Sequence, residues 1–266
     1  MFNIIIIALT GIFRDRVFQG IMILAAFFCF IPSVASLSMR QVTELSITLS
    51  LSLITFILLL LSVFLGSTSL WKDIERRYSF SVVSLPVSRS SYIIGRFLGI
   101  ALFLVLASLV LGAAACIVIK VSSAMYPTPD AKPLVWSYII GAIFFSTLQY
   151  ILLVAVAMLL SSVSTSFFLP VFGTISTYFA SAVTQQVYEF VNSPASAKVV
   201  GSTLKVAANT VYYILPNLAG FDLKVNAIYS IQPSMDGLLL TIGYFIAYTS
   251  MLLGGACLLF RRREMK

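Results

Sequence analysis

The chain has no histidine and only three cysteines, which excludes several kinds of site at once. Without histidine there can be no His-based metal centre and no Ser-His or Cys-His catalytic pair. Cys29, Cys116 and Cys257 fall inside apolar runs and form no CxxC pair, which is the pattern of small packing residues. A GxxxxGK[ST] phosphate loop is also missing, so ATP would have to be hydrolysed on another chain. We therefore expect no catalytic residues, metal or cofactor in this chain.

Charge is scarce as well, at 10% of 266 residues, whereas 60% are hydrophobic and the mean hydropathy is +1.04. Backbone amides cannot stay unpaired in hydrocarbon, so apolar runs near the ~20 residues needed to cross a bilayer must be helices. The sequence predicts an all-α integral membrane protein with a single transmembrane domain, residues 1–266, and no soluble domain. Its six predicted transmembrane helices are 17–37, 45–70, 93–119, 134–160, 167–187 and 238–260.

The net charge of +8 is distributed unevenly between the gaps that separate these runs. If the N-terminus is inside, the inner gaps hold most of the Lys and Arg residues, as the positive-inside rule requires. We therefore predict a multi-pass membrane protein with both termini cytoplasmic. The basic residues adjoin hydrophobic ends, which favours contact with lipid headgroups over nucleic acid binding.

Two further helices are expected outside the spans. Residues 2–13 have apolar positions at helical spacing, which predicts a helix along the cytoplasmic interface, although this segment is alternatively the start of the first span. Residues 198–215 form an amphipathic pattern that ends at Pro216, which predicts an external helix between spans five and six. The helix is either a lid or a packing element, and the sequence does not choose between these roles.

The gap between the second and third spans, residues 71–92, carries the most distinctive pattern. Charged residues from Lys72 to Arg77 continue the second helix, and an amphipathic stretch then stops before Pro86. Ser88 or Ser90 can cap a new helix, in which Arg96 extends toward the headgroups. The small residues of Gly95-x-x-x-Gly99 predict a close contact with another helix.

Three short motifs in this region resemble those of type-2 ABC transporter permeases. They are Ile74-Glu75-Arg76-Arg77, Leu85-Pro86-Val87-Ser88-Arg89 and Gly95-Arg96-Phe97-Leu98-Gly99. The six-span layout, the basic C-terminal tail and Leu215-Pro216-Asn217 are similar too, so the resemblance covers essentially the whole chain. It is closest in style to the subgroup that contains the permease of nitrous-oxide-reductase maturation. Arg96 stands where Lys is more usual, and Tyr78-Ser79 replaces the common Gly-Thr.

The resemblance implies an exporter permease that pairs with an ATP-binding cassette (ABC) ATPase, usually as two permeases, identical or different, with two ATPases that bind ATP and Mg. The loop 71–92 would then dock on the ATPase. The expected coupling residues are Glu75, Arg76, Arg77, Tyr78, Phe80, Pro86 and Arg89. Alternatively the loop is a solvated basic segment that only sets topology, and the protein is a non-transporting scaffold or sensor that anchors a partner.

Two stripes of hydroxyl residues recur at three-and-four spacing on the second and fifth spans. They include Thr48, Ser52, Thr55 and Ser62 on the second span, and Thr174, Thr177, Ser181 and Thr184 on the fifth. Such stripes either pack neighbouring helices together or line a translocation path, as the corresponding helices do in exporters of the similar family. The substrate stays open among lipids, peptides, amphipathic drugs and a sulfur- or copper-related cargo.

Overall fold

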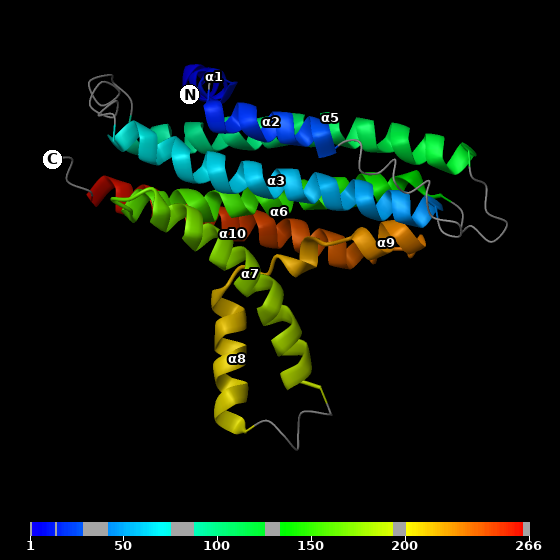
Figure 1. The fold of residues 1–266 in the computed structure, drawn as a ribbon. Helices are drawn as coiled ribbons and strands as arrows, with labels where there is room; N and C mark the ends of the chain where they lie inside the picture. The colour runs from blue at the N-terminus through cyan, green and yellow to red at the C-terminus, as the bar shows by residue number, and fades with distance from the viewer. Residues whose placement is uncertain are drawn as a thin grey trace.

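The computed structural model describes residues 2–13, 15–28, 42–75, 88–125, 134–193 and 201–262, and their regular structure is entirely helical. Four long helices lie side by side in a bundle: α3 (Val42–Glu75), α5 (Arg89–Met125), α6 (Trp136–Val163) and α10 (Met235–Arg262) (Figure 1). The shorter helices are α1 (Phe2–Phe13), α2 (Arg16–Phe28), α7 (Phe168–Val191), α8 (Ser202–Ile214), the 3-10 turn η3 (Ala219–Phe221) and α9 (Lys224–Tyr229). The predicted all-α class is confirmed.

The four long helices are each apolar and long enough to cross a bilayer, over Val42–Trp71, Arg89–Met125, Trp136–Val163 and Met235–Arg261. They coincide with the predicted spans 45–70, 93–119, 134–160 and 238–260. The 37 residues of α5 extend over about 55 Å, which exceeds the ~30 Å hydrocarbon core. A multi-pass membrane protein is therefore confirmed.

The other two predicted spans stay predictions. Span 17–37 corresponds to the 13-residue α2, and its remaining residues lie outside the described part of the chain. Span 167–187 coincides with the 24-residue α7, but α7 is not among the four helices that satisfy both length and apolarity. Its threonines, serines and glutamines make it less apolar than its neighbours.

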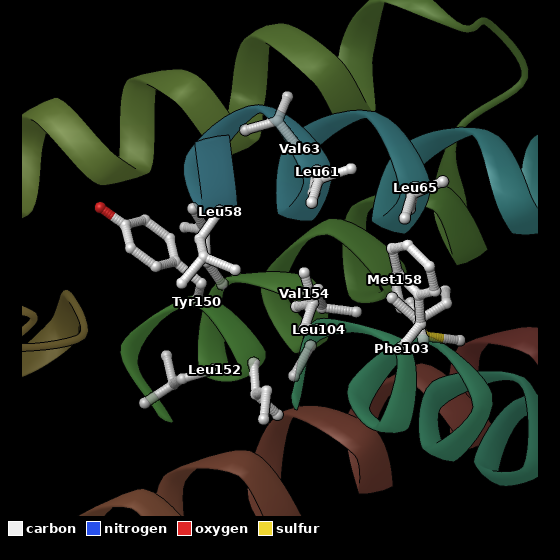
Figure 2. Packing of buried hydrophobic residues seen from close by; sticks show 14 of the residues in the cluster. Leu58, Leu61, Val63, Leu65, Phe103, Leu104, Tyr150, Leu152, Val154 and Met158 are labelled. Atoms are coloured by element: carbon white, nitrogen blue, oxygen red, sulfur yellow. The ribbon is translucent and has the colours of Figure 1, made fainter. Parts of the chain in front are cut away.

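The core is centred on α6, which packs against α3, α5, α7 and α10. Figure 2 shows Leu58 and Leu61 of α3 above Val154 of α6, with Leu104 of α5 close by. Helices α3 and α6 approach closely at Gly66, where an added Cβ would lie 2.7 Å from the Cβ of Ala157. Because lipid tails are as apolar as leucine, this dense packing stabilises the bundle mainly through van der Waals contacts.

Helix α1 crosses α5 near one end of the bundle (Figure 1). A Cβ on Gly99 would lie 2.7 Å from the Cβ of Ala8, so the glycine permits close approach of the two helices. The rings of Phe13, Phe18 and Phe103 meet edge to face, with centroids 5.1 to 5.7 Å apart, and join α1, α2 and α5. The close contact predicted at Gly99 is therefore made with α1. The position of α1 at the membrane interface stays a prediction.

Helices α7 and α8 form a hairpin that leaves the bundle (Figure 1). The first half of α7 packs on α6, with Pro170, Val171 and Thr174 buried. The second half of α7 diverges from the bundle, and α8 lies beside it and packs chiefly on it (Figure 1). We call residues 181–193 and 201–214 the arm.

Candidate functional site

The coupling residues expected from the sequence lie in the loop 71–92, of which the structure describes only the two ends. Arg76, Arg77, Tyr78, Phe80 and Pro86 lie outside the described residues, as does the side chain of Glu75, the last residue of α3. Arg89 is the first residue of α5 and is half-buried. The geometry of this region therefore comes from the helix ends around the loop, which we call the loop junction.

The helix α5 starts with a serine cap, one of the two that the sequence predicted. The Ser91 backbone N–H donates to Ser88 Oγ at 3.1 Å, and the two serine hydroxyls lie 2.7 Å apart. Such a cap satisfies one of the free amides of the first turn and is typically worth about 1 kcal/mol. Arg89 is thereby fixed at the point where the chain re-enters the bundle.

Three contacts tie the start of α5 to the end of α10 at this junction. The Arg89 guanidinium donates to the Arg261 carbonyl oxygen at 3.2 Å, so a cation satisfies a terminal carbonyl of α10. One turn further, the rings of Tyr92 and Phe260 stack with centroids 6.4 Å apart. The Cys257 thiol lies 4.0 Å from the Ser90 carbonyl oxygen, which is a weak hydrogen bond.

The other side of α5 is tied to α3. The Arg96 guanidinium donates to the Ser69 carbonyl oxygen at 3.3 Å, whereas we expected the side chain to extend toward the headgroups. The Ser161 hydroxyl of α6 donates to the Ser67 carbonyl oxygen at 3.2 Å. At this junction, hydrogen bonds and ring contacts therefore connect α3, α5, α6 and α10 into one unit.

The two predicted hydroxyl stripes divide into buried and accessible members. Thr55, Ser62, Thr174 and Ser181 are buried, whereas Thr48, Thr177 and Thr184 are half-buried and Ser52 is exposed. Seven of the eight hydroxyls donate to backbone carbonyls, six of them within their own helix. Hydroxyls bonded in this way are stable without water, so the arrangement suits both helix packing and a closed path.

One tyrosine connects α3 and α7 through α6. Tyr150 of α6 is almost completely buried, and its hydroxyl interacts with Thr55 of α3 and Tyr178 of α7. Figure 2 shows this hydroxyl pointing away from the surrounding leucines. The three residues make a polar contact that joins the three helices.

The most densely bonded polar cluster surrounds Asn217, which the sequence analysis did not select as a site residue. Its backbone N–H donates to the Tyr244 hydroxyl of α10 at 2.8 Å. Its side-chain amide donates to Gln185 Oε1 at 3.2 Å and to the Tyr212 hydroxyl at 2.9 Å. Its Oδ1 accepts from the N–H groups of Ala219 and Gly220. Asn217 thus connects α7, α8, α10 and the turn at η3, and we call these contacts the hub.

Ser181 completes the hub. Its buried hydroxyl donates to the Pro216 carbonyl oxygen at 2.6 Å and accepts from the Leu218 N–H at 2.9 Å. Non-helical backbone within a membrane protein needs such partners because no water is available in hydrocarbon. The signal that could have identified the hub is Asn217 directly after a helix-ending proline, between two spans.

A tyrosine stack continues from the hub along the arm. The rings of Tyr188 and Tyr212 lie parallel with centroids 3.9 Å apart. The pKa of Tyr188 is raised, chiefly by a hydrogen bond with Tyr213. Nearer the tip, the Asn192 side-chain amide donates to Asn209 Oδ1 at 3.2 Å. Asn209 and Tyr212 of α8 therefore turn toward α7, whereas Leu204 and Val206 are exposed.

Comparison with known families identifies the chain. A family model described as ABC-2 family transporter protein matches residues 47–215, which is more than half of the 266 residues. The protein belongs to the ABC-2 transporter family, whose members are membrane permease components without an ATP site of their own. No curated protein gives a significant match. The family membership confirms the permease class that the motifs in residues 74–99 implied, without selecting a subgroup.

Proposed function

We propose that this chain is the permease subunit of an ABC-2-type exporter in the bacterial inner membrane, driven by ATP and Mg bound to a separate ABC ATPase. The observation that carries the proposal is the family match, because residues 47–215 include the entire loop 71–92. We further propose a complex of two permeases and two ATPases. The finer resemblance to the nitrous-oxide-reductase maturation subgroup belongs to the same proposal.

The arrangement of the helix ends supports docking of the ATPase at the loop junction. The last residues of α3, the first residues of α5 and the end of α10 lie together at one end of the bundle (Figure 1). The helix segments at this end carry Lys72, Arg89, Arg96, Arg261 and Arg262, and in the sequence Arg76, Arg77 and Arg263 directly follow the described ends of α3 and α10. A concentration of Lys and Arg at one end is what the positive-inside rule predicts for the cytoplasmic face, where an ATPase binds.

The two ends of the docking loop are fixed to the bundle by the contacts of Arg89 and Arg96. A loop with fixed ends can transmit a displacement into the spans, whereas a loose loop would absorb it. We infer that Glu75, Arg76, Arg77 and Arg89 provide peripheral charges, Tyr78 and Phe80 provide apolar anchors, and Pro86 sets the turn between them.

Co-purification from native membranes tests the docking. Replacing Glu75, Arg76 and Arg89 by Ala should weaken ATPase binding by at most ~1 kcal/mol for each solvated charge. Phe80→Ala should cost roughly 2 kcal/mol because an anchor that fills a pocket loses its contacts. Ile231→Ala, at an exposed position beyond the far end of α10, is the matched control and should bind normally.

The outcome also separates transport from scaffolding. A permease should change the ATP turnover of its bound partner, whereas a scaffold should bind the ATPase and leave its turnover unchanged. Normal co-purification of both loop variants would show that residues 71–92 are not the docking site. Absence of any ABC ATPase from the native complex would contradict the proposed function itself.

A further inference from the structure

Asp222 is an exposed acid that lies beside the polar contact between α3, α6 and α7. Its carboxylate interacts electrostatically with the buried hydroxyl of Tyr150, which also interacts with Thr55 and Tyr178. Tyr150 is at the middle of α6, and Figure 1 shows the segment between α8 and α9 beside the middle part of the bundle. The acid therefore lies along the side of the bundle and not at one of its ends.

The backbone holds Asp222 in a defined position. Phe221, directly before it, is completely buried, and the Asp222 N–H donates to the Ala219 carbonyl oxygen at 3.0 Å. The Asp222 Oδ1 accepts from the backbone N–H of Lys224 at 3.0 Å, at the start of α9. An Asn side chain makes the same local turn, so this hydrogen bond does not account for a negative charge at position 222.

The charge of Asp222 is accessible and is not neutralised by an ion pair. Among the described residues, no Lys or Arg forms a salt bridge with its carboxylate. The side chain of Lys224, two residues further on, is half-buried. A ligand that approaches this side of the bundle therefore meets a negative charge.

Aromatic rings lie next to this charge. The ring of Tyr178 stacks on that of Tyr150 with centroids 6.4 Å apart and meets Phe179 edge to face at 5.5 Å. Phe179 is 60% exposed, and Tyr178 is half-buried. Ring faces attract cations through their quadrupole, and organic ammonium ions are the ligands most often recognised in this way. A carboxylate combined with such rings favours a ligand that is both apolar and positively charged.

We propose that Asp222 and Tyr178 form a recognition site for an amphipathic organic cation, which assigns the substrate class of the exporter. The inference rests on the proposed function. The site adjoins the predicted path on α3, because Thr55 contacts the Tyr150 hydroxyl and donates to the carbonyl oxygen of the exposed Ser52 at 2.9 Å. An acid at this position attracts cations and repels anions of the same shape, so it selects by charge as well as by apolarity.

Two ions of similar size and shape but opposite charge test the site. Tetraphenylphosphonium is the cation and tetraphenylborate the anion, and equilibrium dialysis measures the binding of each to the protein purified from native membranes. Asp222→Asn removes the charge and keeps the hydrogen bond to the Lys224 N–H, so the local turn is retained. This variant should bind tetraphenylphosphonium several-fold more weakly, without any loss of tetraphenylborate binding.

Asp236→Asn is the matched control, because Asp236 is an exposed acid in the first turn of α10. It should bind both ions as the wild-type protein does. Equal binding of tetraphenylphosphonium by the wild-type protein and Asp222→Asn would overturn the proposal. An equal loss of both ions in Asp222→Asn would also overturn it, because that result would indicate a purely structural role.

A second pair of variants tests the ring of Tyr178. Tyr178→Phe keeps the aromatic face and should retain most of the tetraphenylphosphonium binding, whereas Tyr178→Leu should lose it several-fold. Equal binding by these two variants would remove Tyr178 from the site.

Co-purification of the ABC ATPase, measured on the same preparations, reports on the proposed function separately. An ATPase complex without charge-selective binding would leave the function standing and remove the site. Charge-selective binding in a preparation without an ABC ATPase would support the site and contradict the function.

Discussion

The hydroxyl of Tyr244 accepts a hydrogen bond from the backbone N–H of Asn217 at 2.8 Å, and this bond joins α10 to the segment after α8 that turns within the bundle. Among the described residues, the chain around Asn217 is irregular and runs between the end of α8 and the turn at η3. Its backbone groups are satisfied by Ser181, Tyr244 and the Asn217 side chain. The hub therefore makes a break in helical structure compatible with the membrane.

Ser181→Ala should destabilise the protein because it removes both the donor to Pro216 and the acceptor for Leu218 in a buried position. We expect a loss of about 1–3 kcal/mol in the free energy of unfolding, the usual cost of leaving buried polar groups unpaired. Thermal unfolding of the purified protein in detergent measures this. Ser250→Ala, the same substitution at an exposed position on α10, is the control. Equal stability of the two variants would show that the hub does not hold the turn.

Gly66→Ala should weaken the contact between α3 and α6, because the added methyl group would lie 2.7 Å from the Cβ of Ala157. Overpacking of this kind typically costs about 1–3 kcal/mol. Gly141→Ala is the matched control, since nothing lies within 4 Å of its added Cβ. The apparent melting temperature should fall for the first variant alone. Equal melting temperatures would mean that the two helices separate without loss of stability.

Single cysteines at positions 90 and 231, in a background without the native cysteines, should be labelled from opposite sides of the membrane. Ser90 is beside the end of α10, and Ile231 is exposed just before its start, so the spanning helix separates them. An impermeant maleimide added outside intact cells should modify position 231 and leave position 90 unmodified. The reverse pattern would invert the orientation that the basic residues predict.

Ser52→Trp should block transport while leaving assembly with the ATPase intact, if the hydroxyl stripe of α3 lines the path. Ser52 is exposed, so the larger ring can be accommodated without disturbing the core. Leu102→Trp, at an exposed position on α5, is the control for bulk on a lipid-facing surface. Transport by reconstituted complexes measures the effect. Normal transport by Ser52→Trp would favour helix packing as the role of this stripe.

The sequence predicts the long helices of this protein well and its irregular parts poorly. An apolar run such as 134–160 has only one stable structure in hydrocarbon, and α6 follows it closely. The cap at Ser88 is equally local, since the residue bonds an amide three positions away. The motifs at residues 74–99 also led to the family, although most of the coupling residues themselves lie outside the described part of the chain.

The hub was not predictable because its contacts join residues that are far apart in the sequence. Asn217 meets Gln185 and Tyr244 through the path of the whole chain, and no periodic pattern marks such a meeting point. The orientation of α8 is not predictable for a related reason. Its amphipathic pattern does not show which neighbour the helix packs on, and the contact of Asn209 with Asn192 of α7 depends on the position of a second helix.

Through the contacts along its length, α10 connects distant parts of the molecule as one rigid helix. At one end Arg261 and Phe260 are held by Arg89 and Tyr92, next to the loop where an ATPase would bind. Tyr244 and Tyr248, further along the same helix, hold the base of the arm. The intervening residues form uninterrupted helix, and α10 is about 42 Å long in total. A displacement of the start of α5 would therefore move α10 as a rigid body and shift the base of the arm. No residue of α10 between Tyr248 and Phe260 would need to change its backbone conformation.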